Sequence, residues 1–171
     1  MFVALMVAAA FIQIPFYPVP LSFQTAIAVL SGLLLGWKKG VISMTVYMVM
    51  GLAGLPFFTA GGGIFYVFKP TFGYILGFIA AAGVGGAIVR GSNSLVRYII
   101  AAIAACLADY VVGIPYCLVA LHLSGVQNIS TILVTGNLLY IPKDAVLSIV
   151  AAVIASKVIP AIKKIIERRA G

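Results

Sequence analysis

The chain has 171 residues, of which 64% are hydrophobic and only 8% charged, and its mean hydropathy is +1.23. A soluble domain of this length would carry about a quarter charged residues, so the composition excludes a soluble fold and indicates an integral membrane protein. The formal net charge of +8 does not predict nucleic-acid binding, because the basic residues cluster between and after apolar segments.

The apolar segments are long and continuous, which predicts membrane-spanning helices instead of barrel strands with alternating polarity. Since a helix needs about 20 apolar residues to cross a bilayer, we predict an all-α membrane protein with a single six-helix transmembrane domain over residues 1–171. Pro20, Pro70 and Pro142 stand at three helix starts, where a missing N–H costs little. The predicted spans are Met1–Ile14, Leu21–Trp37, Gly40–Phe58, Pro70–Val89, Tyr98–Leu123 and Pro142–Ile162.

The start of the chain and the cysteine content allow further predictions about processing, disulfides and metal sites. Residues 1–14 lack a basic n-region, so we expect no cleaved signal peptide, and the abrupt start of the first helix favours a few preceding residues. Cys106 and Cys117 lie about 16 Å apart along one predicted helix, so no disulfide between them is expected. No CxxC pair or histidine cluster predicts a metal site.

The basic residues set the predicted orientation. Segment Val126–Tyr140 is apolar enough for a seventh span, but that span would move the basic C-terminal segment to the other side of the membrane. We therefore predict an outer loop or a half-buried helix at Val126–Tyr140. With six spans, the positive-inside rule makes the basic side cytoplasmic and places both termini there. The nine residues expected on that side are Lys38, Lys39, Arg90, Arg97, Lys157, Lys163, Lys164, Arg168 and Arg169.

Few ionisable groups lie within the membrane or on its outer side. A carboxylate in mid-membrane, as predicted for Asp109, either faces a cavity or is a protonated or lysine-paired acid that fixes helix packing. Lys69 alone would be interpreted as a lysine that snorkels to the outer interface. Asp144 alone would be interpreted as an acid favoured by the helix dipole in a first turn. Because Lys143 joins these two on the outer side, we favour a binding site there. His122 is expected in a loop.

Enzyme motifs such as GxSxG, HExxH and a Walker sequence are absent from the sequence. We therefore expect no catalytic residue and no resident cofactor. The Gly61-Gly62-Gly63 run lacks the GK[ST] of a phosphate-binding loop, so we expect a flexible turn there. Without a nucleotide site the chain does not power transport itself, which leaves ligand binding, conduction or a subunit role.

Small residues recur at every fourth position in two predicted spans, which lets helices approach one another closely. In the first span the row includes Ala4 and Ala8, and internal packing and docking to a partner are both open for it. In the fourth span we expect packing within this chain. That second row is Gly73, Gly77, Ala81 and Gly85.

Several short motifs follow one another along the chain. They are PVP-x₃-QT at Pro18–Thr25, L-x-G-x-x-x-G at Leu30–Gly36, the run from Tyr47 through Gly51 to Gly54-Leu55-Pro56, P-T-x-G-Y at Pro70–Tyr74, and IPKDAV at Ile141–Val146. In this order, over about Ala4 to Ala155, they resemble the BioY family, the biotin-binding S components of energy-coupling-factor (ECF) vitamin transporters.

The resemblance implies a six-helix protein of the plasma membrane, of bacterial origin, that captures biotin from outside. It also implies assembly with a transmembrane coupling protein and two ATPase subunits, which hydrolyse the ATP. Family members dock partly through an AxxxA row on the first helix, and Ala4 and Ala8 match that spacing. Many members carry a lysine three residues after the aspartate of span six, where this chain has Leu147. Its lysine is instead Lys143. Some members also carry an arginine in the glycine-rich outer loop, where this chain has none.

Biotin offers two ureido N–H donors, a carbonyl acceptor, an apolar thiophane ring and a carboxylate, and a matched pocket would reject analogues that leave its polar groups unpaired. We expect Asp144 or Asp109 to accept from the ureido group, and Lys69 to pair with the carboxylate. The residues expected to donate to the carbonyl are Gln24, Asn137 or Lys143. Apolar and aromatic walls are expected from Phe23, Tyr47, Phe65, Tyr66, Phe68 and Tyr140.

Three alternatives remain open from the sequence. The chain is an S component for another small vitamin, a small membrane enzyme or a structural subunit. An enzyme would need a reactive partner for Asp109, which the sequence does not show. A structural subunit would explain the rows of small residues but not the outer group of Lys69, Lys143 and Asp144. Besides a vitamin and its energising subunits, the only expected partner is membrane lipid.

Overall fold

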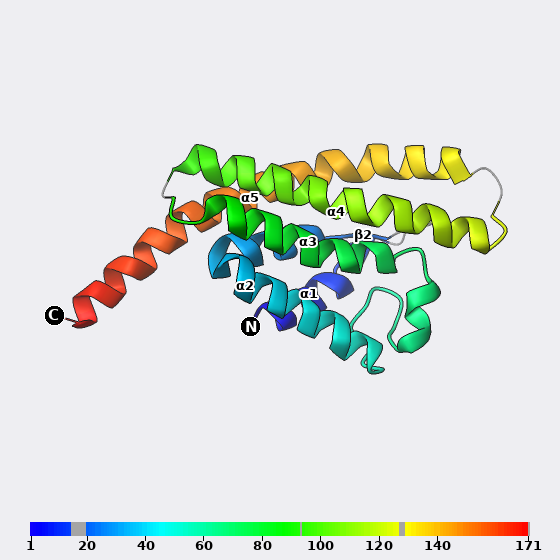
Figure 1. Cartoon of the computed structure of the whole chain (residues 1–171), viewed down its shortest axis with the longest axis horizontal. Coiled ribbons are helices and arrows are strands. Elements are labelled where there is room, and N and C mark those ends of the chain that lie inside the picture. Colours follow the sequence, from blue (N-terminus) through cyan, green and yellow to red (C-terminus); the bar gives the residue numbers. More distant parts are fainter. Residues whose placement is uncertain (15–19, 93, 127–128, 171) are drawn as a thin grey trace.

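The computed structural model describes the backbone of residues 1–14, 20–92, 94–126 and 129–170, and the side chains in these ranges except 21, 129–139, 163–164 and 166–170. It is a helical bundle with one short hairpin (Figure 1). The helices are α1 Phe2–Phe11, α2 Gln24–Leu52, α3 Phe72–Val89, α4 Leu95–Leu123 and α5 Ile129–Ala170, with a 3-10 helix η1 at Ile64–Phe68. Strands β1 Gln13–Ile14 and β2 Leu21–Ser22 pair antiparallel, Gln13 opposite Ser22.

Four of the described helical segments are long and apolar enough to cross a membrane: α2, α3, α4 and residues Tyr140–Ile162 of α5. Helix α1 is apolar but shorter. The chain is therefore an all-helical, multi-pass membrane protein, as its composition indicates.

Helix α2 is bent back on itself at Gly36. This residue has φ 78° and ψ 167°, a non-helical conformation that residues with a Cβ rarely adopt. Gln24 and Tyr47, near the two ends of α2, are hydrogen-bonded to one another, so the second half returns along the first. The reversal comes two residues before the Lys38-Lys39 link that we predicted between the second and third spans, because glycine tolerates the turn and lysine does not.

The last span lies close to the predicted Pro142–Ile162, since the apolar stretch long enough to cross a membrane is Tyr140–Ile162, but the helix that carries it does not begin at Pro142. Helix α5 begins at Ile129, passes Pro142 without ending, and continues to Ala170. Of the two alternatives that we predicted for Val126–Tyr140, the outer loop is wrong, because the chain is helical from Ile129 onward. The helical alternative agrees with the structure. Membrane helices continue through proline because no water is present to take over the freed backbone hydrogen bonds, whereas neighbouring helices re-satisfy them.

Other predicted bounds also differ from the structure by a few residues, and the ends of the first and third spans are two examples. The first span ends as a helix at Phe11, and Gln13–Ile14 joins the hairpin. Helix α2 ends at Leu52 and not at Phe58, because Gly54 adopts φ 107° and Pro56 follows. The loop after α2 folds back on the end of that helix, where the Gly63 N–H donates a hydrogen bond to the Gly51 carbonyl (2.8 Å).

The row of small residues in α3 packs inside the bundle, as predicted. A Cβ added at Gly73 would meet Tyr116, and one added at Gly77 would meet the Asp109 side chain and its backbone oxygen at 2.7 Å. Both neighbours belong to α4, which lies beside α3 (Figure 1). Gly77 and Gly73 therefore set the close approach of these two helices.

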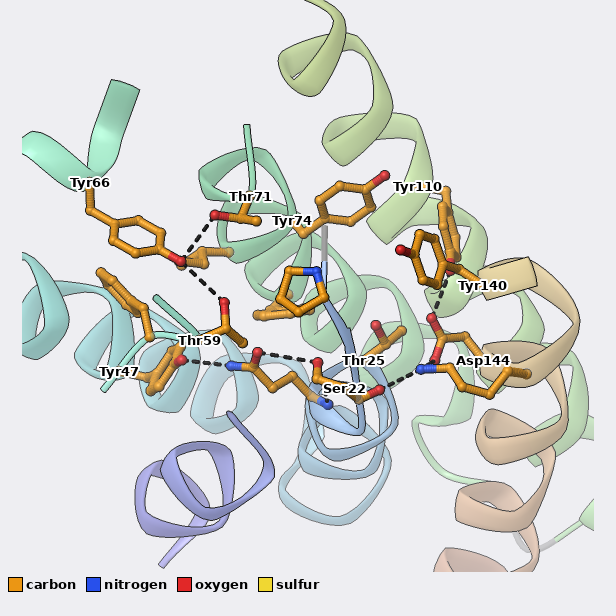
Figure 2. Close-up of a pocket in the computed structure, with 16 residues that line it drawn as sticks. Ser22, Thr25, Tyr47, Thr59, Tyr66, Thr71, Tyr74, Tyr110, Tyr140 and Asp144 are labelled. Carbon is orange, nitrogen blue, oxygen red and sulfur yellow. Dashed lines mark hydrogen bonds and ion pairs between the residues drawn. The ribbon is translucent and has the colours of Figure 1, made fainter. Parts of the chain in front are cut away.

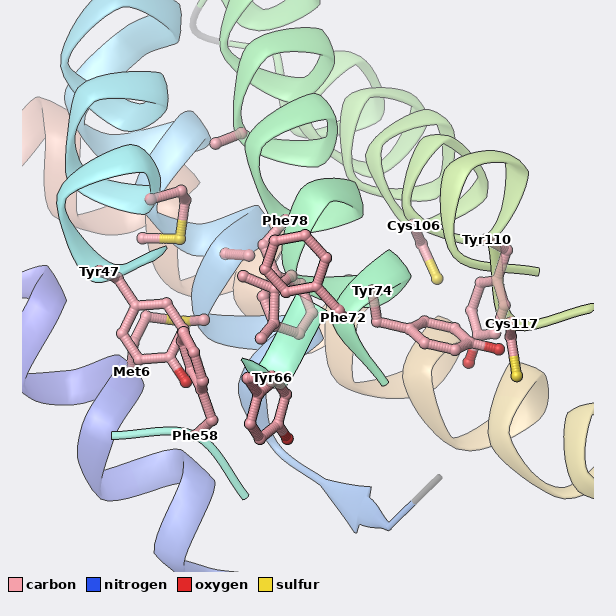
Figure 3. Close-up of a cluster of buried hydrophobic side chains, with 14 of the residues drawn as sticks. Met6, Tyr47, Phe58, Tyr66, Phe72, Tyr74, Phe78, Cys106, Tyr110 and Cys117 are labelled. Atoms are coloured by element: carbon pink, nitrogen blue, oxygen red, sulfur yellow. The ribbon is translucent and has the colours of Figure 1, made fainter. Parts of the chain in front are cut away.

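Aromatic side chains fill the core next to this contact (Figure 3). The Phe58 ring lies 5.5 Å from the Tyr47 ring and 4.5 Å from the Tyr66 ring, between centroids. Cys106 and Cys117 are both buried and free, in agreement with the expectation that they do not form a disulfide. This aromatic cluster forms one wall of the cavity described next.

Candidate functional site

A cavity of about 40 Å³ lies where the start of α2, the start of α3, the middle of α4 and α5 meet (Figure 2). The hairpin contributes Ser22, and the segment between α2 and η1 contributes Thr59. The bend at Gly36 is what brings both ends of α2, with Gln24 and Tyr47, to this one place.

Lys143 and Asp144 form an ion pair on the α5 side of the cavity. The Lys143 Nζ lies 2.8 Å from the Asp144 Oδ1, and the Tyr110 hydroxyl donates to the Asp144 Oδ2 at 2.7 Å. Lys143 also donates to the backbone carbonyl of Ser22. Asp144 is only 4% exposed. Because water is largely excluded, this carboxylate is a strong acceptor for any polar ligand in the cavity.

A second polar group lies on the α2 side. The Gln24 Nε2 donates to the Tyr47 hydroxyl at 2.6 Å, and that hydroxyl donates to the Phe57 carbonyl at 2.9 Å. The Gln24 Oε1 accepts from the Ser22 hydroxyl at 3.3 Å. Gln24 is therefore held on both sides of its amide, with its side chain fixed at the cavity wall.

Tyr66 forms the third side of the cavity. Its hydroxyl accepts from the Thr71 hydroxyl at 3.0 Å and contacts the Thr59 hydroxyl at 3.2 Å (Figure 2). Tyr140 of α5 also lines the cavity. The site thus combines an ion pair, an amide, several hydroxyls and aromatic rings, which is the composition of a small-molecule binding site.

Six of the ten predicted ligand-binding residues line this cavity: Gln24, Tyr47, Tyr66, Tyr140, Lys143 and Asp144. Phe68, Lys69 and Asp109 do not line it. The side chain of Asn137 lies outside the described residues. Of the other wall residues that we expected, Phe23 and Phe65 do not line it either.

Lys69 lies beside the cavity, behind Tyr66. Its Nζ donates to the Ala60 carbonyl at 2.9 Å and lies 4.8 Å from the centre of the Tyr66 ring. The side chain is exposed. Phe68 is 75% exposed and points away from the core. Lys69 therefore contacts Tyr66 at the edge of the site and does not itself line the cavity.

Asp109 does not line the cavity and lies behind Thr25, which does. It is fully buried, and its Oδ2 accepts from the Thr25 hydroxyl at 3.0 Å, while Thr25 itself lines the cavity. The ion pair that Lys143 makes is with Asp144, so the structure does not show Asp109 as a lysine-paired acid. Its geometry favours the packing alternative, with the carboxylate between α4, α2 and Gly77 of α3.

The sequence did not identify several residues of the site, among them Thr25, Thr59, Thr71, Tyr74 and Tyr110. Tyr74 is the last residue of the P-T-x-G-Y motif, so membership in that motif is the sequence signal that points to it. Tyr110 follows Asp109 in α4 but points toward Asp144 of α5. Only the packing of the two helices reveals that partnership.

Comparison with known proteins places the chain in a family. The family model described as "BioY family" matches residues 1–164. The chain belongs to the BioY family. Its relatives include the "Probable biotin transporter BioY" of Lysinibacillus sphaericus, 40% identical over 161 residues that cover 92% of this chain and 82% of the relative. The "Biotin transporter BioY" of Thermotoga maritima is 34% identical, covering 90% of this chain and 89% of the relative.

A solved structure is also similar to this member of the BioY family. It is described as the crystal structure at 2.1 Å of the S-component for biotin from an ECF-type ABC transporter. The TM-score is 0.76 at 25% sequence identity, with 92% of this chain and 86% of the other covered. The helical bundle is thus shared nearly from end to end.

Proposed function

We propose that this chain binds biotin in the cavity beside the Lys143–Asp144 pair and acts in biotin uptake as the S component of an ECF transporter. The observation that carries the proposal is a buried ion pair, hydrogen-bonded by Tyr110, at a cavity in a BioY-family fold. The named relatives are transporters, which agrees with the expectation that the chain is not an enzyme.

The cavity offers partners for each polar group of the biotin ring system. Asp144 is the acceptor for the ureido N–H donors, because its Oδ1 accepts no hydrogen bond of ordinary geometry although Lys143 is close. Lys143 and the Gln24 amide are the donors for the ureido carbonyl. Tyr66 and Tyr140 supply flat apolar faces for the thiophane ring.

The cavity must widen to accept the ligand. Its volume of about 40 Å³ is well below the roughly 300 Å³ of the smallest ordinary ligand pockets. Side-chain rearrangement on binding is common. The contacts of Lys143 with Ser22 and of Gln13 with Thr59 hold the N-terminal hairpin region against the site, and we expect them to change first.

Lys69 is the proposed partner of the biotin carboxylate at the edge of the site. Replacing Lys69 with alanine is expected to weaken biotin binding by about fivefold, in the range of an exposed charge pair. Binding of biotin amide, which lacks the charge, should fall by less than twofold. Isothermal titration of the purified variant with both ligands measures this difference, and equal losses would remove the carboxylate role from Lys69.

We also propose six membrane crossings with both termini in the cytoplasm. The support is the reversal at Gly36, which divides α2 into two antiparallel halves, together with α1, α3, α4 and α5. With this count the basic residues of the α2 bend and of the α3–α4 turn lie on the same side as both termini, as the positive-inside rule requires in a bacterial plasma membrane.

The partners are proposed to be a transmembrane coupling protein and two ATPase subunits of an ECF module. Ala4 and Ala8 are exposed on α1, whereas Phe2 and Met6 of the same helix are buried. A row of small residues that is not used inside the bundle is suited to close contact with another helix. This exposure favours docking over internal packing for the row.

Uptake of radiolabelled biotin tests the proposed function and the docking row together. Cells that express the chain with an ECF module should accumulate biotin faster than cells without the chain. Ala8→Leu is expected to reduce the uptake rate about tenfold, because the larger side chain separates the helices by more than a close contact tolerates. Biotin binding by the purified variant should be unchanged.

The matched control for that experiment is Leu5→Phe, which enlarges an exposed side chain of α1 outside the row. It should leave uptake within twofold of the unaltered chain. An Ala8→Leu chain that supports normal uptake would show that the row is not the docking surface.

A further inference from the structure

A second cavity, of about 390 Å³, lies at the opposite end of the bundle from the biotin site. It is bounded by the α2 bend with Gly36 and Trp37, by the end of α3 with Arg90, and by Ile159 of α5. Ile159 comes 15 residues after Asp144 in α5, which is about 22 Å along a helix. In Figure 1 this is the end where α3 turns into α4.

Three cations line this second cavity: Lys38, Lys39 and Arg90. All three side chains are exposed at its rim. The Lys38 Nζ lies 5.4 Å from the centre of the Trp37 ring, so the ammonium is held over the indole at the edge of the opening.

No carboxylate balances these cations in the part of the chain whose side chains are described. The acids there are Asp109 and Asp144, and the single ion pair found among those residues is the one between Lys143 and Asp144. The third acid of the sequence, Glu167, has a side chain outside the described set. Among the described side chains, the rim is therefore a concentration of positive charge without an internal counterion.

The wall behind the rim is aliphatic. It is formed by Leu33, Leu34, Leu35, Val89 and Ile159. A free inorganic anion would gain nothing from such a wall, whereas the glycerol and first methylene groups of a phospholipid would bury apolar surface against it. The positive-inside rule explains why basic residues gather at this end. It does not require a cavity between them.

We propose that this cavity binds one anionic phospholipid, with the headgroup phosphate between Lys38 and Arg90 and the upper acyl chain against the aliphatic wall. Arg90 suits this role because a guanidinium binds phosphate oxygens in a bidentate manner. Basic pockets between helices on the cytoplasmic side of membrane proteins bind anionic headgroups for the same electrostatic reasons. This lipid site is separate from the biotin site and does not depend on the identity of the vitamin.

Trp37 gives a direct readout, because it is the only tryptophan of the sequence and it lines the cavity. The chain is reconstituted in phosphatidylcholine vesicles that contain a small fraction of phosphatidylglycerol, and acyl-chain bromine is placed on one lipid or the other to quench Trp37 fluorescence. Brominated phosphatidylglycerol should quench more strongly than brominated phosphatidylcholine at the same mole fraction. Each cation removed, by Lys38→Gln or Arg90→Gln, should lower the phosphatidylglycerol preference about fivefold.

The matched control is Lys157→Gln, which removes an exposed positive charge at the same end but outside the cavity. It should keep the preference, and all variants should give the helical circular-dichroism spectrum of the unaltered chain, which shows that they are folded. An equal loss of preference in Lys157→Gln would indicate diffuse surface charge and overturn the proposal. Equal quenching by the two lipids would also overturn it. If inorganic phosphate relieved the quenching more than sodium chloride of equal ionic strength does, the cavity would be assigned to a free anion and the proposal would again fail.

Discussion

Replacing Asp144 with asparagine is expected to weaken biotin binding by about 100-fold. The change keeps the shape of the side chain but removes the charge that balances Lys143 and the acceptor proposed for the ureido group. Truncating one member of a buried, hydrogen-bonded charge pair costs about 2–5 kcal/mol, and about 1.4 kcal/mol corresponds to tenfold in affinity. Isothermal titration of the purified variant with biotin measures the loss.

Asp109→Asn is the matched control, because it makes the same chemical change at the other buried acid. Asp109 does not line the cavity, so its replacement should weaken biotin binding by less than fivefold while lowering the stability of the fold. A large loss in Asp109→Asn and a small one in Asp144→Asn would reverse the assignment of the acceptor.

Replacing Gly77 with alanine is expected to lower the free energy of unfolding by about 3 kcal/mol, the upper part of the usual range for overpacking. The new Cβ would meet the Asp109 side chain, the Asp109 backbone oxygen at 2.7 Å and its Cα at 3.0 Å. Two of these atoms belong to the backbone of α4, so α3 and α4 must move apart. Equilibrium unfolding in detergent, followed by Trp37 fluorescence, measures the change.

The control for this prediction is Gly83→Ala in the same helix. There the added Cβ would meet a single side-chain atom, Cγ2 of Val41, at 3.3 Å. A small rotation of Val41 relieves that contact, and the gain in helix propensity offsets part of the cost. Equal destabilisation by the two substitutions would mean that the α3–α4 contact is not what limits position 77.

The sequence predicts the apolar helices well because their physical cause is local. A continuous apolar run has to satisfy its own backbone hydrogen bonds in lipid, whatever else the chain does. The ends are harder to predict, since Pro142 looks like a helix start and lies inside α5. The reversal in α2 was predicted two residues too late, at the Lys38-Lys39 link, because its exact position depends on the positive φ of Gly36, which the sequence does not show.

The residues of the binding site were likewise predictable where the cause is local and not predictable where it depends on the packing of two helices. Lys143 and Asp144 were identified because charges in an apolar chain are few and costly. Tyr110, which donates a hydrogen bond to Asp144, was missed, because a tyrosine in a membrane helix has many ordinary roles and this contact spans two helices. Asp109 and Lys69 were identified for the same reason as the ion pair, yet the folded chain puts one behind Thr25 and the other outside Tyr66.

The measurement that tests biotin capture most directly is equilibrium binding of biotin to the detergent-purified chain, with desthiobiotin, biotin amide, thiamine and riboflavin as competitors. We expect saturable, tight binding of one biotin per chain, with thiamine and riboflavin unable to compete. Absence of biotin binding by a chain shown to be folded, or displacement of biotin by thiamine or riboflavin, would contradict the proposed ligand.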